Sequence, residues 1–286
     1  MRNDFVAFIL SHGRAGNVDT LKTLRSQGYT GDIVFILDDE DKQRDEYEKR
    51  YGADNIEVFS KLEISKRFDE MVKGDRRTIV YARNAAFDIA EKRGYRYFVE
   101  LDDDYTFFAF CFDENGVPIT REKNTNRLDE VFEAMVHFLE ETPETVKTIA
   151  FSQGGDFIGG VKSDDKKITL KRKAMNSFFC DVKRRFWFIG RINEDVNTYV
   201  LQGNRGDLFF TTTFFSLNQK ITQKNKGGMS DVYIDSGTYL KSMFSVMALP
   251  SAVDCRLMGA KNMRLHHNVK WKNAVPCIIN EKYRKL

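Results

Sequence analysis

Short apolar runs alternate with amphipathic stretches in the first half of this chain of 286 residues, and this order constrains the fold more than any other feature. Phe5 to Leu10 is an uninterrupted apolar run, Val18 to Gln27 has the spacing of a helix, and Asp32 to Leu37 is a second apolar run. Short apolar runs bounded by turn residues indicate buried strands. Two strands joined by a helix pair in parallel, so the sequence predicts a sheet with helices on its faces.

The same alternation continues along the chain. Further strands are expected at Ile56–Phe59, Tyr95–Leu101 and Val146–Phe151, and further helices at Asp41–Tyr51, Thr78–Arg93 and Leu128–Leu139. Beyond residue 151 the pattern is less regular, with short strands expected within Leu208–Phe215 and a helix near Tyr239–Ala248. We therefore expect one α/β domain over residues 1–286, with a mostly parallel sheet and an elaborated, basic C-terminal half.

Three adjacent carboxylates, Asp102, Asp103 and Asp104, directly follow the strand expected at Tyr95–Leu101. Neighbouring acids at the end of a buried strand repel one another, so their ionisation requires a nearby cation. A divalent metal is the simplest such cation, because hard cations prefer carboxylate oxygens as ligands. Acidic clusters also occur in solvated loops and at the starts of helices, and this segment alone leaves both interpretations open.

The net charge of +3 is unevenly distributed. Residues 1–150 carry 22 Lys and Arg against 31 Asp and Glu, whereas residues 151–286 carry 23 against 11. The basic residues expected to contact a polyanion, DNA in particular, are Lys171, Arg172, Lys173, Lys183, Arg184, Arg185 and Arg191. Aromatic residues lie among them, namely Phe178, Phe179, Phe186, Trp187 and Phe188. Interleaved charges and rings are typical of surfaces that bind phosphates and stack bases, so we favour this interpretation over a solvated cationic surface.

The polar loops after the expected parallel strands converge at one edge of the sheet, where open α/β sheets bind their ligands. These loops contain Ser11, Arg14, Asp38 and Asp39. Asp38 is a candidate acceptor for hydrogen bonds from a ribose or a base, and Arg83, on the helix before the acidic strand, is a candidate ligand of a diphosphate. Together with the three aspartates, these residues predict a nucleotide-diphosphate pocket with a metal.

Two further groups of polar residues lie in the basic half. Glu194 and Asp195 form an acidic pair in basic surroundings, and a carboxylate there fits a general base that removes a proton from an acceptor hydroxyl. Acids are also favoured at helix N-termini, and the spacing by itself favours that explanation. His266 and His267 are two of the four histidines in the chain. Imidazole is the commonest neutral metal ligand, although neighbouring histidines are often structural.

The composition narrows the class of protein. Hydrophobic residues make up 42% of the chain and proline is scarce, which argues against extended disorder. The apolar N-terminal run is too short for a signal peptide and no segment reaches the length of a membrane span, so we expect a cytoplasmic protein with no membrane partner. Cys111, Cys180, Cys255 and Cys277 are far apart and form no CxxC pair, which favours reduced structural thiols.

Taken in order, these elements resemble a GT-A-type glycosyltransferase that uses a nucleotide-sugar donor. The matching elements are the Phe5–Leu10 strand with its loop, Asp38-Asp39, Ala82-Arg83-Asn84, Asp102-Asp103-Asp104 at the place of the DxD motif, Asn193-Glu194-Asp195 at the place of the xED motif, and a late histidine. The resemblance extends over residues 5–270. It implies a GT-A-like, Rossmann-type fold with a nucleotide-sugar-binding half at 1–150 and an acceptor-binding half, which carries the base, at 151–286.

Four segments narrow the resemblance to the TET-associated glycosyltransferase group: Ala82–Asn84, Val99–Tyr105, Gly190–Asp195 and Arg264–His267. Members of that group occur in tailed phages and are linked to sugar modification of hydroxymethylated pyrimidines in DNA. The phage enzymes that place arabinose on 5-hydroxymethylcytosine are the specific group that the chain resembles. The resemblance implies a UDP-sugar donor (UDP-arabinose or UDP-glucose), DNA containing 5-hydroxymethylcytosine as acceptor, and the cytoplasm of an infected bacterium.

The resemblance also assigns metal ligands and a base. Asp102 would contact the ribose or the donor sugar and share the metal, and Asp104 would bind Mn²⁺ or Mg²⁺. His267, in preference to His266, would complete the metal site. Asp195 is the expected base, and a base at this motif fits inversion at the anomeric carbon.

Other assignments are less specific. Glu194 is the reserve base, and the residues expected to line the nucleotide pocket are Ser11, Arg14, Asp38, Asp39, Arg83, Asp102 and Asp103, of which Asp103 has no individual role. Two other functions stay open: a similar transferase acting on a glycan or a small molecule, and a non-catalytic nucleic-acid-binding module.

Overall fold

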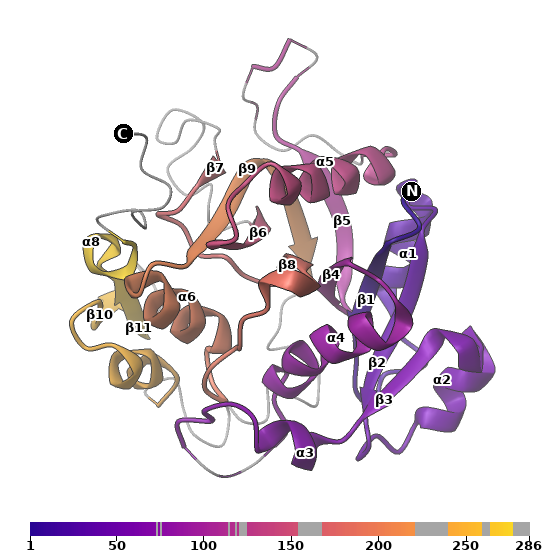
Figure 1. Ribbon diagram of the computed structural model, residues 1–286, viewed down its shortest axis with the longest axis horizontal. Coiled ribbons are helices and arrows are strands. Elements are labelled where there is room, and N and C mark those ends of the chain that lie inside the picture. Colours follow the sequence, from indigo (N-terminus) through magenta and orange to yellow (C-terminus); the bar gives the residue numbers. More distant parts are fainter. Residues whose placement is uncertain are drawn as a thin grey trace.

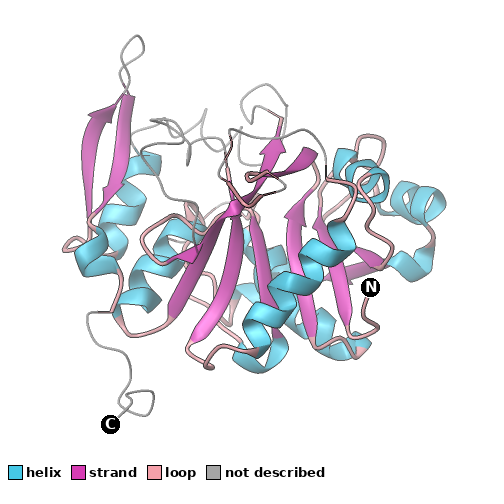
Figure 2. Ribbon diagram, turned by 90° about the horizontal axis from the view of Figure 1, so that it is seen from above, coloured by secondary structure: helices cyan, strands magenta, loops and turns pink. Residues whose placement is uncertain are grey.

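The computed structural model describes residues 1–72, 74, 76–113, 115–117, 119, 125–153, 168–220, 240–258 and 264–276. Within these residues a nine-stranded sheet runs through the molecule with helices on both sides, and a two-stranded hairpin lies at one end (Figures 1 and 2). The strands are β1 Phe5–Leu10, β2 Asp32–Asp38, β3 Ile56–Phe59, β4 Tyr97–Asp102, β5 Tyr105–Phe110, β6 Val146–Ser152, β7 Ile168–Thr169, β8 Ser177–Asp181, β9 Leu208–Gln219, β10 Val253–Met258 and β11 Arg264–Val269. The helices are α1 Asp19–Ser26, α2 Arg44–Tyr51, α3 Lys61–Ser65, α4 Val80–Arg93, α5 Leu128–Glu140, α6 Glu194–Asn204 and α8 Trp271–Ala274, with short 3-10 turns η1 Ala53–Asn55 and η4 Val182–Arg184 and a helical segment at 240–248.

The sheet combines parallel and antiparallel strands in the order β3-β2-β1-β4-β8-β6-β9-β5, and β7 pairs with β9 beside this path. Strands β3, β2, β1 and β4 are parallel, as are β6 and β9, whereas β8 runs antiparallel between β4 and β6. The predicted α/β class is therefore confirmed, and the β3–β4 side is the parallel part that the alternating pattern indicated. Strand β5 was not predicted from the sequence; it follows β4 after a turn but pairs with β9, which lies three places from β4 in the sheet.

Strand β1 shows why a sheet buried on both faces forms here. All six of its residues are buried. The odd-numbered residues pack in the core that contains residues of α1 and α5, and the even-numbered residues pack in the core that contains residues of α4 and α6. Successive residues of a strand point to opposite faces, so a strand covered on both faces requires an unbroken apolar sequence.

Helix α4 delivers the chain into β4, the strand that ends in the acidic turn. The helix ends at Gly94, whose φ of 80° lies in the left-handed region that favours glycine. The N–H of Gly94 donates to the carbonyl of Glu91 (3.1 Å), and β4 begins three residues later at Tyr97. The helix expected at residues 78–93 is thus present, with its start at Val80.

Strand β8 occupies the segment in which base-stacking aromatic residues were expected. Phe178 and Phe179 lie within β8 and are at most 1% exposed, and Phe186 and Phe188 are also buried. These four rings belong to the core, so the expectation that they stack on bases is wrong. Trp187 alone of the five is half-buried. This strand was not predicted from the sequence, because it is only five residues long and has charged residues on both sides.

The predictions about membrane spans and cysteines concern two further features of the described residues. Helices in the described residues are all too short or too polar to cross a membrane. Cys111, Cys180 and Cys255 form no disulfide bond with one another, and the first two are buried. Cys277 lies outside the described residues.

Candidate active site

The acidic turn between β4 and β5 is fixed by the first turn of α1. Thr20 Oγ1 donates to the carbonyl of Asp102 (2.6 Å) and accepts from the N–H of Tyr105 (2.9 Å). The N–H of Thr20 also donates to the carbonyl of Asp103 (3.2 Å). Because the backbone of the turn is held at three points, its side chains project in fixed directions.

Asp103 points back into the protein. Its two carboxylate oxygens accept from Ser11 Oγ (2.6 Å) and from the guanidinium of Arg14 (2.7 Å). Asp103 is 4% exposed. This aspartate therefore ties the loop after β1 to the acidic turn, a role that the sequence did not reveal. Ser11 and Arg14 lie beside the turn as expected, and Arg14 keeps 28% of its side chain exposed.

Asp102 and Asp104 are the two acids of the turn that remain partly exposed, and both lack full compensation of their charge. Burial, followed by repulsion from Asp103, raises the pKa of Asp104 to about 6. Burial raises the pKa of Asp102 to about 7 against the attraction of Arg83, and repulsion from Asp104 and Asp103 adds to the rise. Two under-compensated carboxylates are a donor set that fits a hard divalent cation such as Mn²⁺ or Mg²⁺.

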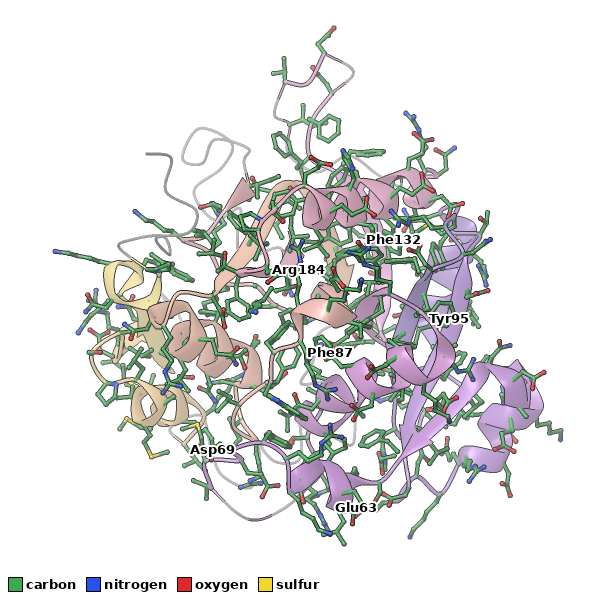
Figure 3. The ribbon with its side chains drawn as sticks, in the orientation of Figure 1. Glu63, Asp69, Phe87, Tyr95, Phe132 and Arg184 are labelled. Atoms are coloured by element: carbon green, nitrogen blue, oxygen red, sulfur yellow. The ribbon has the colours of Figure 1, made fainter. Side chains whose placement is uncertain are left out.

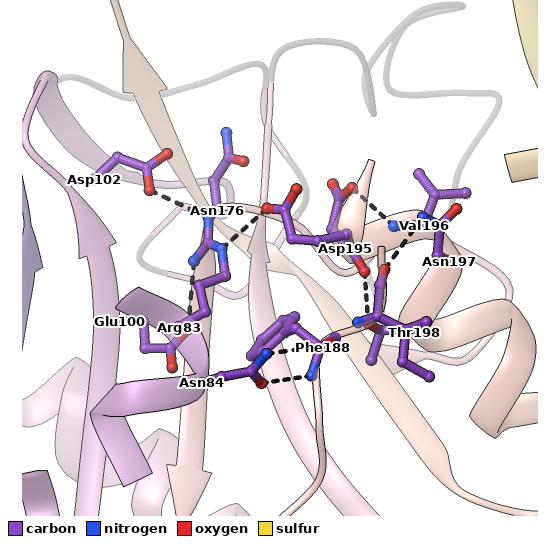
Figure 4. Close-up of polar contacts among 12 residues, drawn as sticks. Arg83, Asn84, Glu100, Asp102, Asn176, Phe188, Asp195, Val196, Asn197 and Thr198 are labelled. Atoms are coloured by element: carbon purple, nitrogen blue, oxygen red, sulfur yellow. Dashed lines mark hydrogen bonds and ion pairs between the residues drawn. The ribbon is translucent and has the colours of Figure 1, made fainter. Parts of the chain in front are cut away.

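Arg83 lies at the centre of the site, but inside the protein (Figure 4). Its residue exposure is 1%, and its guanidinium pairs with three carboxylates: Glu100 (3.4 Å), Asp102 (3.2 Å) and Glu194 (3.1 Å). The expectation that Arg83 binds a diphosphate does not fit this burial. Glu100 is fully buried, and burial raises its pKa to about 8, although Arg83 opposes the rise.

Asn84, the residue after Arg83, fixes the segment that leads to α6. Its amide donates to the carbonyl of Phe188 (3.0 Å) and its side-chain oxygen accepts from the N–H of Phe188 (2.8 Å). Two residues later, Gly190 has a φ of 83°, and a Cβ there would lie 2.5 Å from the amide nitrogen of Asn197. Only glycine meets both requirements, so the path of the chain into α6 is tightly defined.

The second pair of acids begins α6. Glu194 and Asp195 form its first turn, so the acids favoured by a helix N-terminus and the acids of the site are the same residues. Asn193 precedes them with a φ of 53° and donates to the carbonyl of Lys241 (2.7 Å). Burial, together with the charge of Asp195, raises the pKa of Glu194. Asp102 and Asp195 lie on the same side of Arg83 (Figure 4), although β4 and α6 are 92 residues apart.

Both carboxylate oxygens of Asp38, at the end of β2, are bonded by side chains of the protein itself. His12 Nδ1 lies 2.6 Å from one of its oxygens and Lys61 Nζ lies 2.9 Å from the other. Burial raises the pKa of Asp38, but the hydrogen bonds from His12 and Lys61 outweigh it and hold the pKa below its usual value. Asp39 is exposed, and one of its oxygens accepts from the N–H of Lys61 (3.1 Å).

His12 is therefore the group that faces outward where Asp38 was expected to contact the nucleotide. Its side chain is 49% exposed, and the hydrogen bond to Asp38 raises its pKa. Neither His12 nor Lys61 was among the residues predicted to form the site. The polar loop after β1 indicated that a residue such as His12 could face the site. No feature of the sequence indicated Lys61, which is buried on a short helix.

His266 and His267 lie in the β10–β11 hairpin, apart from the main sheet. Lys173 Nζ lies 3.2 Å from His267 Nε2, and burial followed by the charge of Lys173 lowers the pKa of His267 to about 3. In the described residues no three side chains of His, Cys, Asp or Glu are grouped so that they hold a metal ion. Asp102 and Asp104 thus fit a metal, whereas neither histidine is joined to them in this structure.

Six of the seven basic residues expected to bind DNA flank β8 in the sequence, three on each side, and Arg191 lies just before α6. The register pairs Leu101 with Ser177 and Tyr97 with Asp181. The Ser177 end of β8 therefore lies beside the end of β4 that carries the acidic turn, and residues 183–185 lie beyond the other end. Residues 171 and 172 do not lie at the acidic turn, because β7 runs antiparallel to β9 and takes the chain from Thr212 back towards Phe209, where Arg172 lines a pocket with Asp207. Antiparallel pairing separates residues that are close in the sequence.

Three of the four arginines in this basic set, Arg184, Arg185 and Arg191, make internal contacts. Arg184 is buried and donates to three main-chain carbonyls within residues 142–146 (Figure 3). Arg185 pairs with Asp88 of α4 (2.5 Å), and Arg191 is buried and donates to a main-chain carbonyl (2.6 Å). These contacts do not fit the expected role in DNA binding, and we leave the three arginines out of the surface considered below.

The remaining basic residues differ in exposure. Lys171 and Lys183 are exposed, whereas Arg172 and Lys173 are half-buried. The main-chain carbonyl of Lys173 accepts from Thr211 of β9 (3.1 Å), and Lys171 follows β7, which pairs with the same strand, so both lysines before β8 lie beside β9.

Similar solved structures include two of glucosyl-3-phosphoglycerate synthase from Mycobacterium tuberculosis. The complex with Mg²⁺ and UDP is 9% identical at a TM-score of 0.46, and the match covers 93% of this chain and 87% of that chain. The complex with Mn²⁺ and UDP-glucose is 9% identical at a TM-score of 0.45, and the match covers 92% of this chain and 85% of that chain. These likenesses are too distant to carry an argument about function. No curated protein matches the chain.

The family comparison is more specific. A family model described as TET-Associated Glycosyltransferase matches residues 5–228, which include both strands that end in acids, the Ala82-Arg83-Asn84 segment and the acidic start of α6. The match extends over well more than half of the chain and agrees with the resemblance found from the motifs. The chain belongs to the TET-associated glycosyltransferase family.

Proposed function

We propose that the protein is a metal-dependent glycosyltransferase that moves a sugar from a UDP-sugar to the hydroxymethyl group of 5-hydroxymethylcytosine in DNA. The observation that carries this proposal is the meeting of two acidic elements, the turn after β4 and the start of α6, on one side of Arg83. Family membership supports glycosyl transfer as the reaction. The resemblance to phage enzymes that modify hydroxymethylated pyrimidines supports DNA as the proposed acceptor and an infected bacterial cell as the proposed setting.

The acidic turn is the proposed donor side. Asp102 and Asp104 would hold Mn²⁺ or Mg²⁺, which supplies neutralisation of negative charge on the departing diphosphate. Arg14, which is partly exposed beside the turn, is better placed than Arg83 to contact that diphosphate. His12, held by Asp38, faces the region expected for the nucleotide.

The start of α6 is the proposed acceptor side. Asp195 accepts from the N–H of Val196 through one oxygen (2.7 Å). Its carboxylate would take the proton of the hydroxymethyl group as that oxygen attacks the anomeric carbon. The bond from the anomeric carbon to the diphosphate then breaks, UDP leaves, and the configuration at the anomeric carbon inverts.

The acceptor surface is narrower than the sequence suggested. Lys171 and Lys173 are the lysines of the expected set that lie beside β9. Phosphate contacts from these residues would hold the DNA, and a base in a duplex would have to leave the stack to reach the donor.

The decisive experiment combines several donors with matched acceptors. The protein is incubated with Mn²⁺, with UDP-arabinose or UDP-glucose, and with duplexes that carry either cytosine or 5-hydroxymethylcytosine. Mass spectrometry of the digested nucleosides then reports an added pentose or hexose. We expect sugar only on the hydroxymethylated duplex and only without EDTA. Equal transfer to a free monosaccharide would refute the DNA acceptor, and absence of UDP release with every donor and acceptor would refute the proposed reaction.

A further inference from the structure

Arg83 connects the two acidic elements of the site from beneath. Its Nε donates to Glu194 at the start of α6 (3.1 Å), while its two terminal nitrogens donate to Glu100 (3.4 Å) and Asp102 (3.2 Å) of β4. We propose that Arg83 is a positioning residue that holds Asp102 and Glu194 at a fixed separation and does not contact the donor. This inference rests on the proposed function and adds to it a residue that acts through the acids.

The surroundings of Arg83 separate it from ligands. The guanidinium carbon lies 4.9 Å from the ring centre of Phe178 and 5.7 Å from that of Phe188. With 2% of its side chain exposed, the guanidinium has no surface that a diphosphate reaches without displacing a carboxylate. Its positive charge therefore acts on the acids and not directly on a bound nucleotide.

The geometry requires an arginine. A guanidinium presents donors in a rigid planar fork, so one group can bond carboxylates that approach from three directions. A lysine ammonium would retain the charge but lose this fixed arrangement. Since Glu194 lies 111 residues from Arg83 in the sequence, the fork is a long-range connection between α4, β4 and α6.

The neighbouring residue strengthens the same connection. Asn84 holds both main-chain polar groups of Phe188, six residues before Glu194. From one turn of α4, Arg83 thus holds the side chain of Glu194, and Asn84 holds the backbone that leads into α6. The Ala82-Arg83-Asn84 segment, which the sequence suggested as part of the nucleotide pocket, is in our interpretation a clamp for the acids around it.

A kinetic test separates positioning from ligand binding. Arg83→Lys should lower kcat by about 10²-fold, because a small misplacement of reacting groups costs that much. The Kd for UDP with Mn²⁺, measured by calorimetry, should stay within about threefold of the wild-type value. The matched control is Arg93→Lys on the far end of α4, where Arg93 pairs with Glu57 (2.8 Å), and it should leave both quantities unchanged. A tenfold rise of the Kd for UDP with little change in kcat would overturn the proposal, as would unchanged kcat and Kd.

If Arg83→Lys does not fold, Phe178→Leu provides the second test. It loosens one side of the guanidinium and leaves every carboxylate in place, so kcat should fall by about fivefold with no change in the Kd for UDP. An unaltered kcat in a folded Phe178→Leu protein would overturn the proposal.

A thermal cycle tests the connection without any donor. Tm is measured for the wild type, Arg83→Met, Glu194→Gln and the double variant. Removal of Arg83 leaves buried acids without their cation, so Glu194→Gln should be several degrees more favourable in the Arg83→Met background than in the wild type. Equal shifts in both backgrounds would overturn the coupling. If the wild type turns over no UDP-sugar, the proposed function fails while this cycle still decides the role of Arg83.

Discussion

The acidic turn after β4 and the basic, aromatic segment at residues 171–191 both stand out in the sequence, but the structure uses them differently. The turn lies at the end of a parallel strand, with Asp102 and Asp104 partly exposed. Most of the basic segment passes through the protein as β8 and its flanks, with Phe178, Phe179 and Arg184 buried. The difference shows that composition indicates a ligand site more reliably at the end of a strand than along one.

The physical reason is the direction of each element. Parallel strands all end at one edge of the sheet, so polar residues after β1, β2 and β4 meet whatever their order in the sequence. Strand β8 is antiparallel, and its five residues separate its two flanks by roughly 17 Å. A cluster of charge that is continuous in the sequence is therefore divided between the two flanks of β8.

The strongest test of the acidic turn is Asp104→Asn. We expect metal-dependent turnover to fall by about 10³-fold, because the substitution removes a charged ligand expected to hold the cation. The fold should survive, since loss of one charge relieves repulsion from Asp103, the neighbour that raises the pKa of Asp104. UDP release with Mn²⁺ and a thermal melt by circular dichroism measure the two effects.

The control for Asp104→Asn is Asp45→Asn on the exposed surface of α2, which should change neither quantity. An Asp104→Asn protein that is unfolded would mean that the acidic turn is structural, and the comparison between the two regions would then fail.

Arg184→Met tests the basic segment from the opposite side. The substitution removes a buried charge that bonds three main-chain carbonyls and lies 3.6 Å from Asp181. We expect the free energy of unfolding to fall by about 3 kcal/mol, because the carbonyls and Asp181 lose a buried partner. Urea denaturation measures the change. Lys183→Met, at the exposed neighbouring position, should stay within about 0.5 kcal/mol of the wild type. Equal and small effects at both positions would place Arg184 on the surface.

The dependence of stability on pH tests the burial of Glu100 beneath the turn. Its pKa is about 8 in the folded protein against 4.5 for an ordinary glutamate, so the folded state keeps a proton that the unfolded state has lost between these values. The contribution of Glu100 to the free energy of unfolding must therefore decrease as the pH rises from 4.5 to 8. Relative to the wild type, Glu100→Gln should gain about 5 °C in Tm between pH 5 and pH 8.5 in metal-free buffer.

Other groups titrate in the same range, so the difference between the two proteins is the quantity to measure. His12, with its raised pKa, acts in the same direction as Glu100, and His267, with its lowered pKa, acts in the opposite one. A Tm difference that is constant with pH would contradict the shifted pKa of Glu100.

The smallest effect concerns two exposed lysines that flank β8 in the sequence. Lys171→Ala should weaken binding to duplex DNA by a few-fold and reduce the slope of log Kd against log salt by about one. Lys183→Ala should change neither, because Lys183 lies beyond the Tyr97 end of β4. Equal effects of the two substitutions would mean that the DNA does not approach along the β9 side of the molecule.

Local patterns in the sequence determined the framework of this protein. The sequence alone predicts the apolar strands β1, β2 and β4 and the amphipathic helices between them, because strands and helices buried against a core have fixed periodicities. The three aspartates after β4 and the acids at Glu194 and Asp195 were also visible, since charged residues next to apolar strands require an explanation. These features were sufficient to suggest the family.

Tertiary structure alone decided which of the selected side chains face the site. The exposed fraction of Arg83 depends on Glu194, Phe178 and Phe188, which are distant in the sequence, so no local pattern reveals that this arginine is enclosed. The same holds for the pairing of Asp103 with Arg14 and of Asp38 with Lys61. Charges select their partners through contacts that form only when the sheet is complete, and its antiparallel strands β5 and β8 were not visible in the sequence.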